Sequence, residues 1–330
     1  MKSRNLLACV TGALAVGAPV AFGVGSSTVL SLLTQAAIFA VFALGVGLLL
    51  RQNGMISFGH ALYYGASGYV VAIALQTKMA PAEVAIVLAI VGLTALAFVM
   101  GLVMVRVPGV AFGMLTLAVG QMAYLTASRA RGLTGGADGM NVEWPNTLFG
   151  VSVNLLSKPG PMLMLCWTVL VLLMAGLAWL LRGRFGAITE AVRDNEERAR
   201  FINIKTLAPR AAVYALSAGV TAFAGVLQAF YTSFVSPEAL HWSLSGVALM
   251  MVVVGGTKVL WGPALGAAVY FLAKDALGES AQHWMAIFGT ALIVVIVFAP
   301  QGLSGILVRL VSGRKTAPAG VAKAATRAAH

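Results

Sequence analysis

The side chains best suited to chemistry or to binding a partner are concentrated between Arg182 and Lys205. The chain has 22 basic and 10 acidic residues, and ten of these charged residues lie in this stretch, which we call the charged segment. Two acids in it precede a base by four residues, a spacing that stabilises a helix by a few tenths of a kcal/mol per pair. The pairs are Asp194 with Arg198 and Glu196 with Arg200. This pattern favours a helix that docks with another protein over a catalytic centre.

We expect one short helix here, from about residue 187 to residue 203. Asn203 lies where the helix should end, because asparagine tolerates left-handed backbone. The weakly apolar stripe of the helix suits a protein groove better than lipid. A helix lying on anionic lipid is the alternative, which the acids weaken because lipid-binding faces are usually basic. The residues that we assign to docking are Glu190, Ala191, Val192, Arg193, Asp194, Asn195, Glu196 and Arg198.

A second set of polar side chains lies within otherwise apolar stretches. Such groups can hydrogen-bond a polar solute without carrying charge, or they can join one helix to another. A proton relay at the one histidine of the set lacks support, because no acidic residue lies in the middle of an apolar stretch. We assign these residues to a possible solute path, with helix packing as the alternative for each: Gln35, Ser57, His60, Gln121 and Gln228.

Several chemistries lack their sequence motif. The chain has no GxxxxGK[ST], HExxH or GxSxG, and its two cysteines form no pair with metal-site spacing. Residues 132–140 are glycine-rich, but the Lys-Ser/Thr of a phosphate-binding loop does not follow them. We therefore expect no catalytic residues, no metal and no cofactor bound by this chain, and in particular no ATP held by that loop.

Composition identifies the elements that must position these residues. The chain is 60% hydrophobic and only 10% charged, which is far from a soluble domain. Continuous apolar runs of about 20 residues recur, each long enough to cross a bilayer as a helix. The fold class is therefore an all-α polytopic membrane protein. The formal charge of +12 is better explained by basic loops on the cytoplasmic side than by nucleic acid.

We expect about ten transmembrane helices. The candidate spans are 5–24, 28–50, 57–76, 83–104, 109–128, 161–181, 210–230, 242–256, 259–273 and 284–300. With both termini in the cytoplasm, the loops alternate between the two sides of the membrane. Only five of the 22 basic residues then lie on the side away from the cytoplasm. Those five are Lys78, Arg129, Arg131, Lys158 and Lys274. The first span could instead be a signal peptide, but an uncleaved span fits the charges better. The transmembrane domain then covers residues 1–310, and residues 311–330 form a disordered basic tail in the cytoplasm.

Several blocks resemble one family of transport proteins. The charged segment contributes GAITEAVRDNEERARFINI, in which the run from Ala191 to Glu196 is the most specific part, and the other blocks lie on either side of it. All the matching blocks are Gly54 to Gly65, Thr134 to Gly139, Gly186 to Ile204, Tyr214 to Leu227 and Gly255 to Gly266. Together they are similar to the membrane subunits of the branched-chain amino acid ABC importers, in particular to the M-type subunit. Asn203 departs from the family pattern, which usually has glycine there.

The resemblance implies function, partners and location. It implies a permease in a bacterial inner membrane that carries branched-chain amino acids or a related solute such as urea, an amide or a carboxylate. It implies a second homologous permease, two ABC ATP-binding subunits that hold ATP and magnesium, and a periplasmic substrate-binding protein. The charged segment would be the coupling helix, seated in a groove of one ATPase. Membrane lipid surrounds the chain, and nucleic acid is not expected.

Two other classes of function compete with an importer permease. A stand-alone secondary transporter would need an ionisable or broken-helix site at mid-depth, and no charged residue lies there in the sequence. A membrane enzyme or an assembly scaffold is the third possibility, and the enzyme lacks any acid–base or metal constellation.

Overall fold

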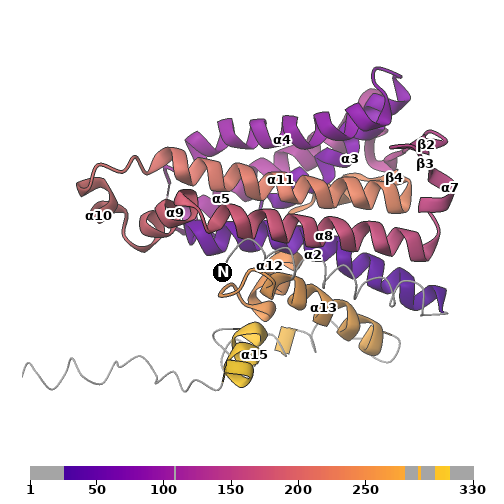
Figure 1. Ribbon diagram of the computed structural model, residues 1–330. Coiled ribbons are helices and arrows are strands. Elements are labelled where there is room, and N and C mark those ends of the chain that lie inside the picture. Colours follow the sequence, from indigo (N-terminus) through magenta and orange to yellow (C-terminus); the bar gives the residue numbers. More distant parts are fainter. Residues whose placement is uncertain (1–25, 108, 279–288, 291–301, 313–330) are drawn as a thin grey trace, which may run out of the picture.

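The molecule is a bundle of long helices, seen from the side in Figure 1. The computed structural model describes residues 26–107, 109–278, 289–290 and 302–312. Its longer helices are α2 (Ser27–Asn53), α3 (His60–Gln76), α4 (Ala82–Met104), α5 (Val110–Arg129), α8 (Pro159–Leu181), α11 (Leu207–Thr232), α12 (Trp242–Gly255) and α13 (Gly262–Gly278). Five of these described helices are long and apolar enough to cross a membrane: α2, α4, α5, α8 and α11. The predicted class, a helical multi-pass membrane protein, agrees with this architecture.

Short elements connect the long helices. The α-helical ones are α6 (Arg131–Thr134), α7 (Val153–Leu156), α9 (Arg184–Asp194), α10 (Glu196–Phe201) and α15 (Gly302–Ser312). Two 3-10 turns, η1 (Gly136–Asp138) and η2 (Pro237–Leu240), lie at the end of the bundle opposite α9 and α10. Two small antiparallel pairs complete this end. β1 (Met140–Asn141) pairs with β4 (Phe234–Val235), and β2 (Thr147–Leu148) pairs with β3 (Val151–Ser152).

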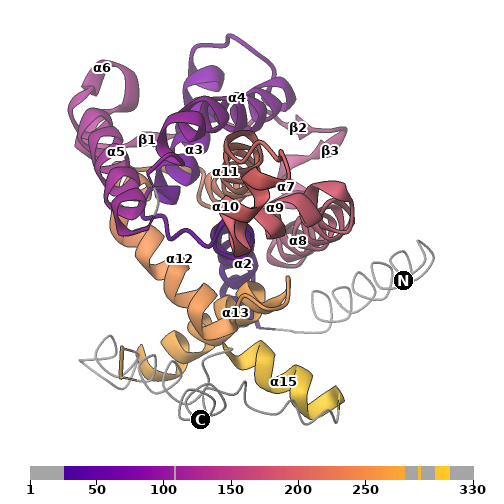
Figure 2. The same cartoon turned by 90° about the vertical axis from the view of Figure 1, so that its left-hand side faces the viewer.

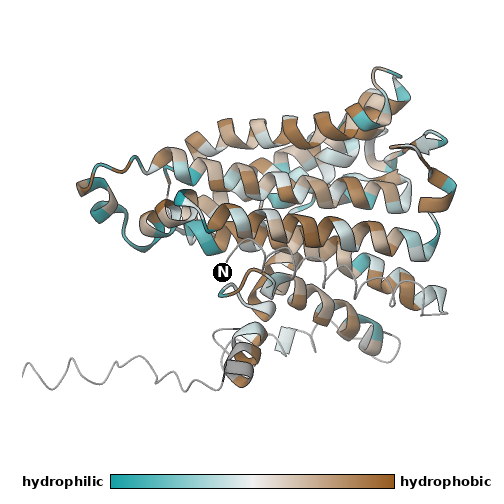
Figure 3. Cartoon of the chain, viewed as in Figure 1, coloured by the Kyte–Doolittle hydropathy of each residue, from teal (hydrophilic) through white to brown (hydrophobic). Residues whose placement is uncertain are grey.

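Helix α2 lies at the centre of the bundle, as the end-on view in Figure 2 shows. It contacts α11, α13, α8 and α12, and its middle turns are buried on all sides. A helix that is apolar all round belongs in such a position. By contrast, α4 buries one narrow stripe of alanine, leucine and glycine against its neighbours. Its outward side exposes Val87, Val91 and Val99, as expected of a surface that faces lipid (Figure 3).

Residues 54–59 return into the bundle without forming a helix. α2 ends at Asn53, and α3 begins at His60, whose imidazole lies beside Gly45 and Ser217 within the bundle. Extended backbone at such a depth needs internal hydrogen-bond partners. The N–H of Phe58 donates to Thr116 Oγ1 at 3.2 Å, and the N–H of Ala61 donates to Ser245 Oγ at 2.7 Å. We call residues 54–59 the re-entrant segment.

The structure tests the predicted spans unevenly. The spans that begin at residues 28, 83, 109, 161 and 210 correspond to the five long apolar helices, and 57–76 corresponds to α3 after the re-entrant segment. The predicted spans 242–256 and 259–273 correspond to α12 and α13. The span 5–24, most of 284–300 and nearly all of the tail lie outside the described residues. The total of ten spans and the division into domains therefore stay predictions.

Candidate functional site

The charged segment lies at one end of the bundle, where α9 packs beside the ends of α8 and α11 and α10 projects beyond them (Figure 1). Hydrophilic residues dominate this end, as the teal ribbon in Figure 3 shows. The predicted single helix from 187 to 203 is wrong in one respect, because the chain forms two helices that meet at Asn195. Asn195 has extended backbone, with φ −160° and ψ 102°.

The break has a local cause in the side chain of Asn195. Its Oδ1 accepts a 2.8 Å hydrogen bond from the N–H of Arg198, which makes Asn195 the N-cap of α10. The predicted pair of Asp194 with Arg198 does not form, because the break separates them. Asp194 instead binds Arg193 at 2.7 Å. The left-handed conformation predicted for Asn203 is confirmed, with φ at 61°.

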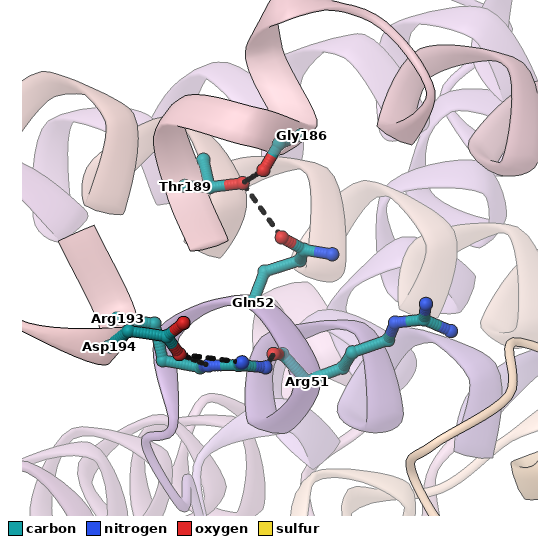
Figure 4. A network of polar contacts seen from close by, with 6 residues as sticks. All are labelled: Arg51, Gln52, Gly186, Thr189, Arg193 and Asp194. Atoms are coloured by element: carbon teal, nitrogen blue, oxygen red, sulfur yellow. Dashed lines mark hydrogen bonds and ion pairs between the residues drawn. The ribbon is translucent and has the colours of Figure 1, made fainter. Parts of the chain in front are cut away.

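Helix α9 is attached to the end of α2 by two contacts, drawn in Figure 4. Thr189 Oγ1 donates to Oε1 of Gln52 at 2.7 Å, and both side chains are buried. Arg193 Nη1 donates to the carbonyl oxygen of Arg51 at 2.5 Å. Gly54 then turns the chain with φ 65°, and a Cβ at this position would touch the stem of Arg193. These contacts make α9 continuous with α2 and with the start of the re-entrant segment.

Helix α10 is tied to α11 through Glu196. Its carboxylate binds Arg200 at 2.6 Å and Arg210 at 2.5 Å, and the hydroxyl of Thr206 donates to it at 2.9 Å. The predicted pair of Glu196 with Arg200 is therefore confirmed. Partial burial raises the pKa of Glu196, but the hydrogen bonds from Thr206 and Arg200 and the charges of Arg210 and Arg200 outweigh it. The pKa of Glu196 consequently lies below its ordinary value.

The remaining surface of the charged segment has no partner within the described chain that would cover it. Exposed residues on it are Glu190, Ala191, Asp194, Asn195, Glu197 and Arg198. At its tip, Phe201 is 89% exposed and Ile202 is 67% exposed. Phe201 is the last residue of α10, and Ile202 follows it. Large apolar side chains exposed beyond the ends of the membrane helices, beside charges of both signs, are typical of a surface that binds protein. Of the residues predicted to dock, Val192 is buried, and it anchors α9 instead.

A cavity of about 620 Å³ lies at the opposite end of the bundle. Its walls come from α2, α3, α5, the last turns of α11, β4, η2 and the start of α12. The lining side chains are mainly apolar and aromatic, with polar groups from the loop between α11 and α12. They include Phe39, Tyr64, Tyr124, Gln228, Glu238 and His241. A cavity of this size and character is typical of a site for a small solute.

The predicted path residues fall in different places. Gln228 lines the cavity, and its Oε1 is buried with no hydrogen-bond partner among the described residues. Gln35 lies on α2 one turn before Phe39, and Gln121 lies on α5 one turn before Tyr124. Neither is among the residues that line the cavity. A role in the solute path remains a prediction for each of these residues.

His60 and Ser57 belong to a buried hydrogen-bonded cluster in the α3 region of the bundle. Ser217 Oγ donates to the carbonyl oxygen of Gly45 at 2.7 Å, so it accepts from His60 Nε2 at 2.6 Å. His60 Nδ1 then accepts from the hydroxyl of Ser57 at 2.9 Å. Every polar atom of a neutral imidazole is satisfied in this arrangement. The cluster joins α2, α3 and α11. These hydrogen bonds favour helix packing as the role of His60 and Ser57, and a role in the solute path stays a prediction.

Sequence reasoning missed Gln52, Glu238 and His241. Gln52 meets Thr189 across 137 positions, a pairing that no local pattern signals. Glu238 lies within the short 3-10 turn η2 and His241 directly follows it, and the Ser-Pro-Glu sequence there indicates only a turn. Within the ranges that the structure describes, no three metal-ligating side chains converge. The arrangement is suited to binding a protein at one end and a solute at the other.

These features define a class of protein: a multi-pass helical membrane permease with a protruding polar segment. A sequence model of the family described as branched-chain amino acid transport system, permease component, matches residues 28–297. The chain therefore belongs to this family of permeases, and a stand-alone carrier is not favoured.

Curated relatives agree with the family. The high-affinity branched-chain amino acid transport system permease protein LivM of Escherichia coli is 25% identical over 312 residues, which cover 88% of this chain and 72% of the relative. LivM of Salmonella typhimurium is 23% identical over 290 residues, with 82% and 68% covered. The fructose import permease protein FruF of Bifidobacterium longum is 29% identical over 143 residues, or 40% of each chain. No solved structure matches the chain at a significant level.

Proposed function

We propose that this chain is a permease subunit of an ATP-driven ABC importer in a bacterial inner membrane. Both termini lie in the cytoplasm, and the charged segment docks with a separate ATP-binding subunit. Two such subunits bind ATP and magnesium, a second homologous permease pairs with this chain, and a periplasmic binding protein delivers the solute. The names of the relatives support branched-chain amino acids as the solute class. The match to a fructose permease over part of the chain keeps other small polar solutes within the family's range.

The observation that carries the docking proposal is the two-sided character of α9. One side is fixed to α2 through Thr189 and Arg193, whereas the other side exposes Glu190, Ala191 and Asp194. A rigid element held on one side and uncovered on the other can transmit force from a partner to the membrane helices. Ordered contacts then continue from α9 through the end of α2 and the re-entrant segment to the cluster around His60.

The solute path is proposed to include the cavity at the other end of α11. Its size suits a small solute, and its position is opposite to the charged segment along the bundle. With the charged segment in the cytoplasm, the cavity faces the side from which a binding protein delivers. Gln228 lines the cavity, and its buried Oε1, which has no hydrogen-bond partner among the described residues, is proposed to accept a hydrogen bond from a solute N–H.

Co-purification from mild detergent tests the docking proposal. Tagged wild-type protein is expected to bring ATP-binding subunits and a second permease with it, as identified by mass spectrometry. Glu197→Lys should lose the ATP-binding subunits and retain the second permease, because Glu197 is exposed on the charged segment. Glu143→Lys is the matched control, since it makes the same charge change in a loop at the opposite end of the bundle. Recovery of the chain alone under conditions that keep other ABC complexes intact would overturn the proposal.

A further inference from the structure

Among the described residues that line the cavity at the end of α11, Glu238 is the one with a formal charge, and none is a lysine or an arginine. His241 also lines the cavity, but its Nδ1 accepts a hydrogen bond from the N–H of Ser243, as in a neutral imidazole. A carboxylate is ionised at neutral pH, so the cavity has a net negative field.

The rest of the lining suits an apolar body. Phe39 and Tyr64 form the wall on the α2 and α3 side, and Leu244 and Val235 contribute further apolar surface. Tyr124 lies across the cavity with its ring 5.0 Å, centroid to centroid, from that of His241. Aromatic faces and a carboxylate together attract an ammonium group, because the ring face and the carboxylate are both negative.

We propose that Glu238 is a specificity-determining residue that selects solutes by charge. It attracts solutes that carry an ammonium group and disfavours anionic solutes that lack one. This inference rests on the proposed function, since it assumes that solute passes through the cavity. Within the solutes considered for the family, it favours amino acids and neutral amides over simple carboxylates.

The field of the cavity can be measured without transport. Ser243→Cys places a thiol in the cavity wall. The parent chain, whose native cysteines are Cys9 and the buried Cys166, supplies the background rate. Full-length protein in spheroplasts is treated with cationic aminoethyl methanethiosulfonate or anionic sulfonatoethyl methanethiosulfonate. Adding Glu238→Gln should lower the ratio of the cationic to the anionic rate by roughly fivefold, because one charge acts on the two reagents with opposite sign. Adding Glu143→Gln instead should leave the ratio unchanged.

Protection of the same thiol tests selectivity directly. Leucine and the carboxylate with the same skeleton but no amino group are added before the neutral reagent methyl methanethiosulfonate. Leucine should slow the reaction at a concentration several-fold lower than the carboxylate does, and Glu238→Gln should remove the difference. Because the binding protein takes no part, its own specificity does not enter the result.

Two results would overturn the inference. One is a rate ratio that Glu238→Gln leaves unchanged or that Glu143→Gln changes equally. The other is a carboxylate that protects the thiol as well as leucine does. Neither measurement requires the ATP-binding subunits, whereas the importer proposal is tested by their co-purification. A failure of charge selection is therefore distinguishable from a failure of the importer proposal.

Discussion

The hydroxyl group of Thr189 lies 2.7 Å from Oε1 of Gln52, and this buried hydrogen bond joins α9 to the end of α2. Thr189→Val keeps the shape of the side chain and removes the hydroxyl. It should leave Gln52 without a partner for Oε1, at a cost of about 1–3 kcal/mol. The exposed face of α9 is unchanged, so ATP-binding subunits should still co-purify while solute uptake falls. Uptake and co-purification measured on the same preparation check this.

The matched control for Thr189→Val is Thr126→Val. Thr126 is exposed on α5, and its hydroxyl donates only to the carbonyl oxygen of Met122 within the same helix. Uptake and thermal stability should stay close to the wild type in the control. Equal losses in the two variants would show that the bond to Gln52 has no special role in coupling.

Phe201 offers a test of docking that leaves charge untouched. Because the side chain is 89% exposed, Phe201→Ala should change thermal stability little. If the ring is an anchor for an ATP-binding subunit, its loss should weaken the complex about tenfold or more. Titration of the purified ATP-binding subunit against the permease measures this change. Val110→Ala, which removes part of another highly exposed apolar side chain at the start of α5, should have no effect on the titration.

Gly59 is a packing requirement of the re-entrant segment. A Cβ at this position would lie 2.4 Å from the carbonyl oxygen of Thr116, which is backbone and cannot move aside alone. Gly59→Ala should therefore displace α5 and destabilise the protein by about 1–3 kcal/mol. Gly92→Ala is the control, because a Cβ at Gly92 on α4 meets nothing within 4 Å. A thermal melt in detergent that gives the same midpoint for both variants would contradict the tight packing.

The ion pairs of Glu196 predict a dependence of local stability on pH. The folded pKa lies below the ordinary value of about 4.3, so the unfolded chain binds the proton more readily. The stabilisation is complete above the ordinary pKa, and it is lost as the pH falls through the folded pKa. Hydrogen exchange of α10 should thus accelerate relative to other helices below about pH 4.3, after correction for the intrinsic rate. Glu196→Gln should flatten that difference, and an unchanged profile would argue against the network.

Much of the architecture could be predicted from the sequence, because lipid imposes a simple requirement. A run of about 20 apolar residues must be helical if its backbone is to be satisfied in a bilayer. The spans found as α2, α4, α5, α8 and α11 carry this signal plainly. The left-handed turn at Asn203 could also be predicted, since the residue type itself permits that backbone.

The rest depends on contacts between distant parts of the chain. The break at Asn195 follows from competition between a helical hydrogen bond and an N-cap, and periodicity does not decide which one forms. Arg193 turns to Asp194 and to the backbone of Arg51 because α2 ends beside it. The cavity gathers residues from five helices and the loop beyond α11, so only Gln228 among its polar residues was predicted.

The re-entrant segment also sets the order in which the chain can be assembled in the membrane. The backbone N–H of Phe58 has its hydrogen-bond acceptor on Thr116, and the partner of His60 is Ser217, which is synthesised 157 residues later. Until then, unpaired polar groups make this stretch costly to release into lipid. We therefore expect the nascent hairpin of α2 and α3 to remain beside the insertion machinery until α11 emerges. On this reasoning we expect membrane insertion of this protein to be a delayed, collective event rather than a helix-by-helix one.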